Sequence, residues 1–235
     1  MVNSYRQSNI FTAALGGILA SSMLVQAAPL TSPLTQIVNA NTTTTATTTY
    51  ASGNAPFAGG AAYTGPSGAY PVAQIFPKYA ALYNAKTGDH FQSPQGLVSR
   101  SPTTGGADIS ALVTFEVPAE YSSNWCQVAF VLQNADSEAT GSLQAQLYTS
   151  LAPAGTDVAS WPSGNLRDQF LGNIDIVVGG EASFEAGSGP AATSNGFFPC
   201  SLISGRVYGG EIVPRGDSVK VSWPACNDGI NIFVY

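Results

Sequence analysis

The stretch Cys126-Gln127-Val128-Ala129-Phe130-Val131-Leu132-Gln133 alternates between two sets of side chains. One set is apolar: Cys126, Val128, Phe130 and Leu132. The other set is Gln127, Ala129, Val131 and Gln133. This period of two is typical of a β-strand, whose successive side chains point to opposite faces of a sheet. We therefore predict a strand here, with the set of Cys126 turned toward the core.

The same period recurs on both sides of this strand. Val113, Phe115 and Val117 define one face of a strand that Pro118 ends, and residues 143–148 and 218–223 alternate in the same way. Further candidate strands are 174–178, 182–185, 207–213 and 230–235. About eight short strands without intervening helices predict an all-β fold, an antiparallel two-sheet β-sandwich.

The composition excludes one class of partner. Only 9% of the residues are charged, against about 25% in a typical globular chain. The 8 basic residues, against 14 acidic ones, cannot supply the positive surface that nucleic acid binding needs. A surface built from neutral polar residues suits an extracellular protein, so we expect no nucleic acid partner.

The first 27 residues have the pattern of a secretory signal peptide. An apolar run extends from Ile10 to Val25, and small residues at Val25 and Ala27 favour cleavage after Ala27. The run is too short and too interrupted for a membrane span. Residues 229–235 lack the polar spacer and hydrophobic tail of a glycolipid anchor signal. We predict secretion, to the medium or the cell wall, without a membrane anchor.

Residues 28–77 are predicted to form a disordered linker, and residues 78–235 the folded domain. No charged residue occurs between Gln7 and Pro77, and residues 41–49 are a threonine-rich tract that cannot bury enough apolar surface to fold. Exported tracts of this kind commonly carry sugars. The predicted glycosylation sites are Asn41, Thr42, Thr43, Thr44 and Thr45.

The chain has three cysteines, so an oxidising compartment favours one disulfide and one spare thiol. A bond between Cys126 and Cys226 would close a long interval of the chain and contribute about 4 to 5 kcal/mol on the chain-entropy model. Cys200 would then be a buried free thiol or an intermolecular handle.

Three segments resemble a known family, the C-terminal domain named after the fungal ubiquitin-3-binding protein "But-two". The resemblance starts at Phe76-Pro77 and is clearest at Phe115-Glu116-Val117-Pro118, followed by Cys126-Gln127-Val128-Ala129-Phe130. It returns at Val213-Pro214-Arg215-Gly216 and at Trp223-Pro224-Ala225-Cys226. It covers about residues 76–235 and implies that Cys126 and Cys226 are the family's cysteine pair.

The resemblance implies more about fold than about function. Members similar to this chain are mostly secreted or wall-associated fungal proteins without an assigned activity. The family name suggests a ubiquitin-pathway partner, which the signal peptide disfavours. Only nine residues follow Cys226, where the family continues further, so a shortened or differently paired last strand is expected.

The motifs of common enzymes are missing. The single histidine, His90, follows Gly88-Asp89, and no G-x-S-x-G elbow exists to supply a nucleophile, so we interpret His90 as a loop residue. Zinc spacings and phosphate loops are also absent, and no cofactor is predicted. Two of the 14 acidic residues could still form the carboxylate pair of a hydrolase.

Two loops carry the remaining candidate binding residues. Asn134, Asp136 and Glu138 place oxygens at alternate positions, which is a weak candidate for a calcium site beside the simpler interpretation as a solvated turn. Trp161 is flanked by Ser160 on one side and by Pro162, Ser163 and Gly164 on the other. It is the best candidate for an exposed aromatic ring that stacks on a sugar. Trp223 is expected in the core.

These observations favour a secreted, non-enzymatic protein that binds a cell-wall glycan or a surface protein through its β-sandwich. A secreted carbohydrate-active hydrolase with a carboxylate pair is the main alternative.

Overall fold

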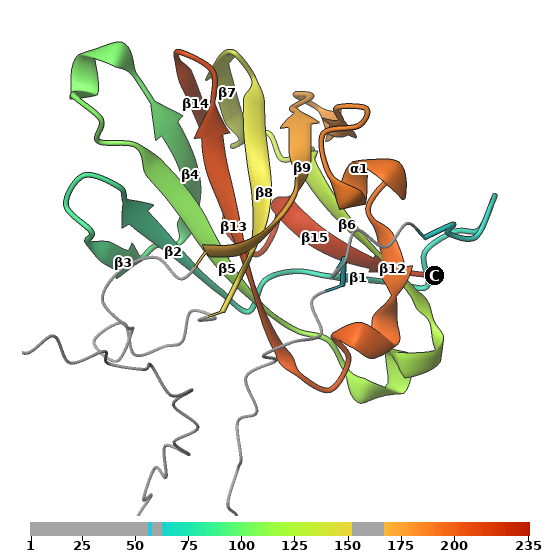
Figure 1. Ribbon diagram of the computed structural model, residues 1–235. Helices are drawn as coiled ribbons and strands as arrows, with labels where there is room; N and C mark the ends of the chain where they lie inside the picture. The colour runs from blue at the N-terminus through green and yellow to red at the C-terminus, as the bar shows by residue number, and fades with distance from the viewer. Residues whose placement is uncertain (1–55, 58–62, 152–166) are drawn as a thin grey trace, which may run out of the picture. The chain divides into compact units, whose positions relative to one another are not determined.

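The computed structural model describes residues 56–57, 63–151 and 167–235. These residues form fifteen β-strands in two curled sheets, whose paired strands run antiparallel (Figure 1). This confirms the predicted all-β sandwich, with more strands than the eight that alternation indicated. No helix in the described ranges has the length and apolar character needed to cross a membrane.

The smaller sheet has five strands and is built around β6. It follows the order β1-β15-β6-β10, and β12 also pairs with β6. Its strands are β1 (Ala73–Ile75), β6 (Trp125–Leu132), β10 (Gly180–Glu181), β12 (Phe197–Pro199) and β15 (Gly229–Val234).

The larger sheet has ten strands. It follows the order β11-β9-β8-β13-β5-β4-β14-β7, and β2 joins it by pairing with both β3 and β5. Its strands are β2 (Tyr79–Asn84), β3 (His90–Gln92), β4 (Gln95–Arg100), β5 (Ile109–Glu116), β7 (Glu138–Gly141), β8 (Gln144–Ser150), β9 (Arg167–Asp175), β11 (Ser183–Phe184), β13 (Val207–Arg215) and β14 (Val219–Pro224). The helical elements are short: η2 (Pro102–Thr104), η3 (Ala119–Ser123), α1 (Pro190–Thr193) and η5 (Cys200–Leu202).

The core lies between the two sheets, and Trp223 is its largest fully buried side chain. This side chain is 2% exposed and packs edge-to-face on Phe130, with ring centroids 5.1 Å apart, which confirms its predicted burial. Gly96 and Gly229 make room for it, because a Cβ atom on either would lie 2.1 Å from the indole. A strand of each sheet therefore contributes one ring to the same contact.

Strong alternation located strands well, and weak alternation did not. The predictions for 126–133, 143–148, 207–213, 218–223 and 230–235 correspond to β6, β8, β13, β14 and β15. The prediction for 174–178 was displaced, because β9 ends at Asp175. Strand β2, with the sequence YAALYN, carries little contrast between its two faces and was missed; its pairing with β5 over six residues defines it.

The folded domain begins before the predicted boundary at Lys78. Strand β1 pairs with β15, placing Ala73 opposite Val234. Phe57 is 2% exposed in the core, and its ring lies 5.5 Å from that of Phe198. The return of charge at Lys78 therefore did not mark the start of packing. The predicted signal peptide and the predicted glycosylation sites Asn41, Thr42, Thr43, Thr44 and Thr45 lie outside the described residues.

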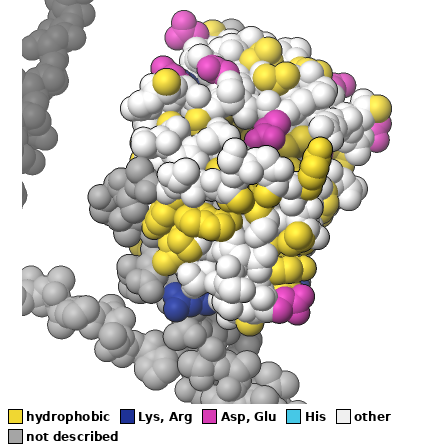
Figure 2. All heavy atoms as spheres, turned by 90° about the vertical axis from the view of Figure 1, so that its right-hand side faces the viewer, with side chains coloured by type: hydrophobic (Ala, Val, Ile, Leu, Met, Phe, Trp, Pro, Cys, Tyr) yellow, Lys and Arg dark blue, Asp and Glu magenta, His cyan; other side chains and the backbone are white. Residues whose placement is uncertain are grey.

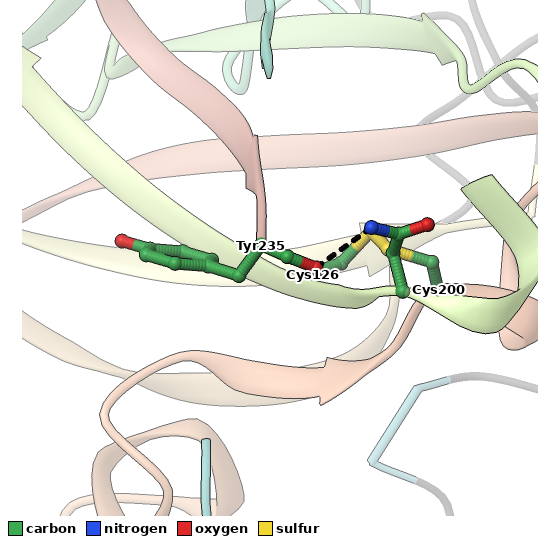
Figure 3. The surroundings of a disulfide bond; sticks show 4 residues. Cys126, Cys200 and Tyr235 are labelled. Atoms are coloured by element: carbon green, nitrogen blue, oxygen red, sulfur yellow. Dashed lines mark hydrogen bonds between the residues drawn. A yellow bond between two sulfur atoms is a disulfide. The ribbon is translucent and has the colours of Figure 1, made fainter. Parts of the chain in front are cut away.

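The predicted disulfide between Cys126 and Cys226 is wrong. Cys126 is bonded to Cys200, and Cys226 is a free, half-buried thiol. Strand β12 pairs with β6 so that Phe198 lies opposite Cys126, which brings Cys200 close. Figure 3 shows this bond beside Tyr235, whose carbonyl accepts a 2.8 Å hydrogen bond from the Asn124 side chain.

The register of β15 against β6 explains why Cys226 cannot form a disulfide with Cys126. Gly229, at the start of β15, lies opposite Val131, and Cys226 precedes Gly229 in the chain. From Cys126 to Val131 the strand extends about 16 Å, whereas the Cα atoms of a disulfide lie within about 7 Å of each other. The two cysteines are therefore at opposite ends of β6.

We expect the substitution Phe57→Ala to lower the free energy of unfolding by about 3 kcal/mol, because it removes a fully buried ring from the core. Urea denaturation measures the change. The matched control is Phe91→Ala, since Phe91 is 50% exposed and should cost far less. Equal losses for the two variants would place Phe57 outside the folded domain.

Peptide mapping under non-reducing conditions should link Cys126 to Cys200, with Cys226 recovered as an alkylated thiol. Replacing Cys200 with Ser should cost about 4 kcal/mol of stability, because the bond spans 74 residues of chain. Replacing Cys226 with Ser should leave stability nearly unchanged. A peptide that contains both Cys126 and Cys226 would contradict this pairing.

Candidate functional site

The outer face of the ten-stranded sheet carries aromatic and amide side chains. The side chains of Val113 and Phe115 on β5 face the core. Successive side chains of a strand point to opposite faces, so Leu112 and every second residue from it face outward. Pairing across the strands aligns one row, which is Ala81, Leu112, Glu211, Tyr148 and Phe170. We name the part of this surface over β2, β5, β13, β8 and β9 the tyrosine face; its half-buried side chains are Tyr79, Tyr83, Gln144, Gln146, Tyr148, Phe170 and Asn173.

An ion pair fixes the centre of the tyrosine face. Glu211 is 0% exposed and receives two 2.8 Å hydrogen bonds from Arg167. The hydrogen bonds that Arg167 donates to Glu211 are the main cause that raises the pKa of Arg167. The guanidinium carbon lies 4.6 Å from the ring centroid of Tyr148, in a cation–π contact. Gly209 occupies the position opposite Ser150, so it places no side chain beside Arg167.

A chain of hydrogen bonds orients the amides of the tyrosine face. Tyr148 donates to the Gln146 oxygen at 3.5 Å, and Gln146 donates to the Asn173 oxygen at 3.2 Å. Asn173 in turn donates to Glu185 at 2.7 Å. Arg215 also donates to Glu185, and these two donors lower the pKa of Glu185. Each amide uses one N–H in this chain and has a second to donate.

An open groove of about 530 Å³ adjoins the tyrosine face at Tyr79 and Gln92. Its other lining residues include Lys78, Ser93 and the free thiol of Cys226. Burial raises the pKa of Cys226, so the thiol is less reactive than an exposed one. The groove volume falls in the range of small-ligand sites, about 300 to 1,000 Å³.

The cavity that the described residues form between the sheets is too small for such a ligand. A cavity of about 20 Å³ adjoins Phe57, and its lining is almost entirely apolar, with Phe115, Phe198 and Tyr208 among the residues around it. That volume is enough for about one water molecule. The candidate site is therefore on the surface of the sandwich.

His90 lies at one edge of the tyrosine face. It opens β3, stands opposite Tyr83, and its Nδ1 atom is 3.4 Å from the carbonyl oxygen of Gly88. It is half-buried in a strand, rather than in the loop that the sequence indicated.

The acidic side chains of the tyrosine face are engaged by donors. Lys78 lies 2.6 Å from Glu116, and Asp175 accepts a 3.0 Å bond from Gln144. Partial burial raises the pKa of another acid, Glu181, but this residue belongs to β10 of the five-stranded sheet. The raised pKa of Glu181 therefore belongs to a carboxyl group outside the tyrosine face.

The candidate calcium ligands Asn134, Asp136 and Glu138 belong to a turn that is anchored by Asp228. Asp228 is 3% exposed and accepts hydrogen bonds from the backbone of Gln133 and Asn134 and from the Ser137 hydroxyl. The Asn134 side-chain oxygen accepts from the Asp136 amide at 2.9 Å. Within the described ranges, no three His, Cys, Asp or Glu residues gather as a metal site. No local sequence pattern indicates the role of Asp228, because this residue is about 90 positions away from the turn that it anchors.

The outer face of the five-stranded sheet differs in character. Figure 2 shows the side on which β6, β12 and α1 lie in Figure 1; its hydrophobic side chains form several patches, and its charged side chains are few. Gly65 lies against the ring of Phe197 here, because a Cβ atom at this glycine would be 2.3 Å from the ring. Part of this face is therefore covered by the segment that precedes β1.

The two tryptophans other than Trp223 are Trp125 and Trp161. Trp125 begins β6 and contacts Tyr63, with ring centroids 6.2 Å apart. Trp161 lies outside the described residues, between Leu151 after β8 and Arg167 at the start of β9. Its role stays a prediction. Sequence reasoning missed Tyr79, Tyr83 and Tyr148 as binding residues. The available signal was that Tyr79 and Tyr83 are four residues apart, and so on one face of β2, and that Tyr148 shares the outward set of β8 with Gln144 and Gln146.

A scan against protein-family models finds no match for this chain. A search of curated proteins also finds none. The resemblance to the "But-two" domain family therefore stays a prediction.

We expect Asp228→Ala to lower the free energy of unfolding by about 2 kcal/mol, because three part-buried donors lose a charged acceptor. Asp136→Ala is the control, since Asp136 is exposed in the same turn and should cost about 0.5 kcal/mol or less. Thermal melting with calcium or with a chelator should give the same midpoint. A calcium-dependent midpoint that is lost in Asp136→Ala would favour the metal site instead.

Proposed function

We propose that this protein is a secreted, non-enzymatic β-sandwich that binds glycan through the tyrosine face and the groove beside it. The observation that carries this proposal is the hydrogen-bonded chain from Tyr148 through Gln146 to Asn173. Aromatic rings offer apolar contact to the C–H groups of a sugar, and amides donate to its hydroxyl groups. Because the amides are already oriented, less conformational entropy is lost when a ligand binds.

The state of the acidic residues supports binding over hydrolysis. A glycosidase needs two accessible carboxyl groups, one of which has a raised pKa so that it can act as the acid. On the tyrosine face, Glu211 is fully buried under Arg167. Hydrogen bonds from Arg215 and Asn173 keep the pKa of Glu185 low. A carboxylate pair is therefore the weaker alternative, and the proposal needs no cofactor.

The place of action follows from the sequence. A signal peptide over residues 1–27 and a glycosylated tether would carry the domain to a cell wall or another surface. A surface protein is an alternative partner for the same face, whereas a ubiquitin-pathway partner would require residence in the cytosol. We retain Trp161 as a candidate contact, because the segment that contains it joins β8 to β9.

The test is a binding assay on a glycan array with the secreted protein and two variants, Tyr79→Ala and Tyr148→Ala. Each loss of a ring should weaken binding about tenfold, which corresponds to about 1.4 kcal/mol. Tyr70→Ala is the matched control, because Tyr70 is 90% exposed and precedes β1 of the other sheet. Trp161→Ala is measured in parallel.

Three outcomes would overturn the proposal. These are the absence of any glycan binding, an equal loss in Tyr70→Ala, and turnover of a bound glycan that disappears when a carboxylate is replaced. Circular dichroism of each variant separates lost binding from lost folding.

A further inference from the structure

The basic groups on the tyrosine face are all held in ion pairs. Within the described part of the chain, they are Lys78 with Glu116 at 2.6 Å, Arg167 with Glu211 at 2.8 Å, and Arg215 with Glu185. Every positive charge on this face therefore has a negative charge beside it. Asp175 adds a further negative charge in the row of Gln144.

The other basic side chains of the described ranges point elsewhere or lie at the margin. Arg100 is bonded to Asp108 at 2.7 Å and to the Gly216 carbonyl. Lys220 is exposed on the outer side of β14, which lies past β4 in the strand order and so outside the tyrosine face. Lys86 extends toward Gly105, and Arg206 precedes β13. The centre of the tyrosine face thus has amide, hydroxyl and ring groups, with carboxylates among them and no uncompensated cation.

This charge arrangement discriminates between two classes of glycan. A uronate, sulfate or phosphate group on a sugar would approach carboxylates without gaining a new cationic partner, so its binding would include like-charge repulsion. An uncharged sugar needs only hydroxyl hydrogen bonds and ring contacts, which the oriented amides and tyrosines supply. We infer that the tyrosine face selects uncharged glycans and that its paired carboxylates exclude acidic ones. This inference rests on the proposed glycan-binding function.

The experiment compares binding of the full-length secreted protein to two sets of polysaccharides. The uncharged set is β-glucan, mannan and chitin, and the acidic set is polygalacturonate and heparin. We expect at least a tenfold preference for a member of the uncharged set. Its affinity should change less than twofold between 50 mM and 1 M NaCl, because salt screens only interactions between charges.

The outcomes separate the two proposals. Preference for an acidic polysaccharide, with affinity that falls in salt, would overturn the inference and leave glycan binding intact. Absence of binding to both sets would overturn the proposed function and the inference together.

A variant tests the carboxylates directly. Glu185→Gln removes the charge opposite Arg215 and keeps an oxygen that can accept from Asn173. We expect binding to polygalacturonate, measured relative to the uncharged set, to rise at least fivefold at low salt and to lose this gain at 1 M NaCl. Glu138→Gln, on exposed Glu138 of β7, is the matched control and should leave this ratio unchanged. No gain in Glu185→Gln would show that the carboxylates do not exclude acidic glycans.

Discussion

The packing of β6 against the inner face of the ten-stranded sheet is the constraint on which the rest of the structure depends. Strand β6 pairs with β15 along one edge and with β10 and β12 along the other, so its backbone bonds are made within the sheet. Its alternate side chains then enter the core, where Phe130 meets Trp223. The disulfide from Cys126 adds a covalent link at one end of the same strand.

The surface chemistry follows from this packing. Once Val113 and Phe115 of β5 face the core, the alternate residues of the neighbouring strands must face outward. Tyrosines and amides therefore gather on one side of the larger sheet, although they come from strands far apart in the chain. The low content of charged residues has a consequence here, because the few cations near this face are used in ion pairs. Recognition on such a face depends on hydrogen bonds and ring contacts.

The ion pair of Arg167 and Glu211 links this surface to the fold. A buried carboxylate is costly unless it is paired and hydrogen-bonded, and two bonds from one guanidinium meet that requirement. The pair also fixes the start of β9 beside β8 and β13. The same contact thus positions Tyr148 and holds together the strands that carry the oriented amides.

The sequence by itself determined the fold class and the inward-facing residues of β5, β6, β8 and β14, because alternation is a local pattern that burial on one face imposes. It also placed Trp223 in the core. Only the tertiary structure decided that Cys126 bonds to Cys200, that Phe57 belongs to the core, and that Asp228 anchors a distant turn. Each of these depends on which strands become neighbours. Strand pairing brings together residues separated by tens of positions, and the spacing of residues along the chain does not specify it.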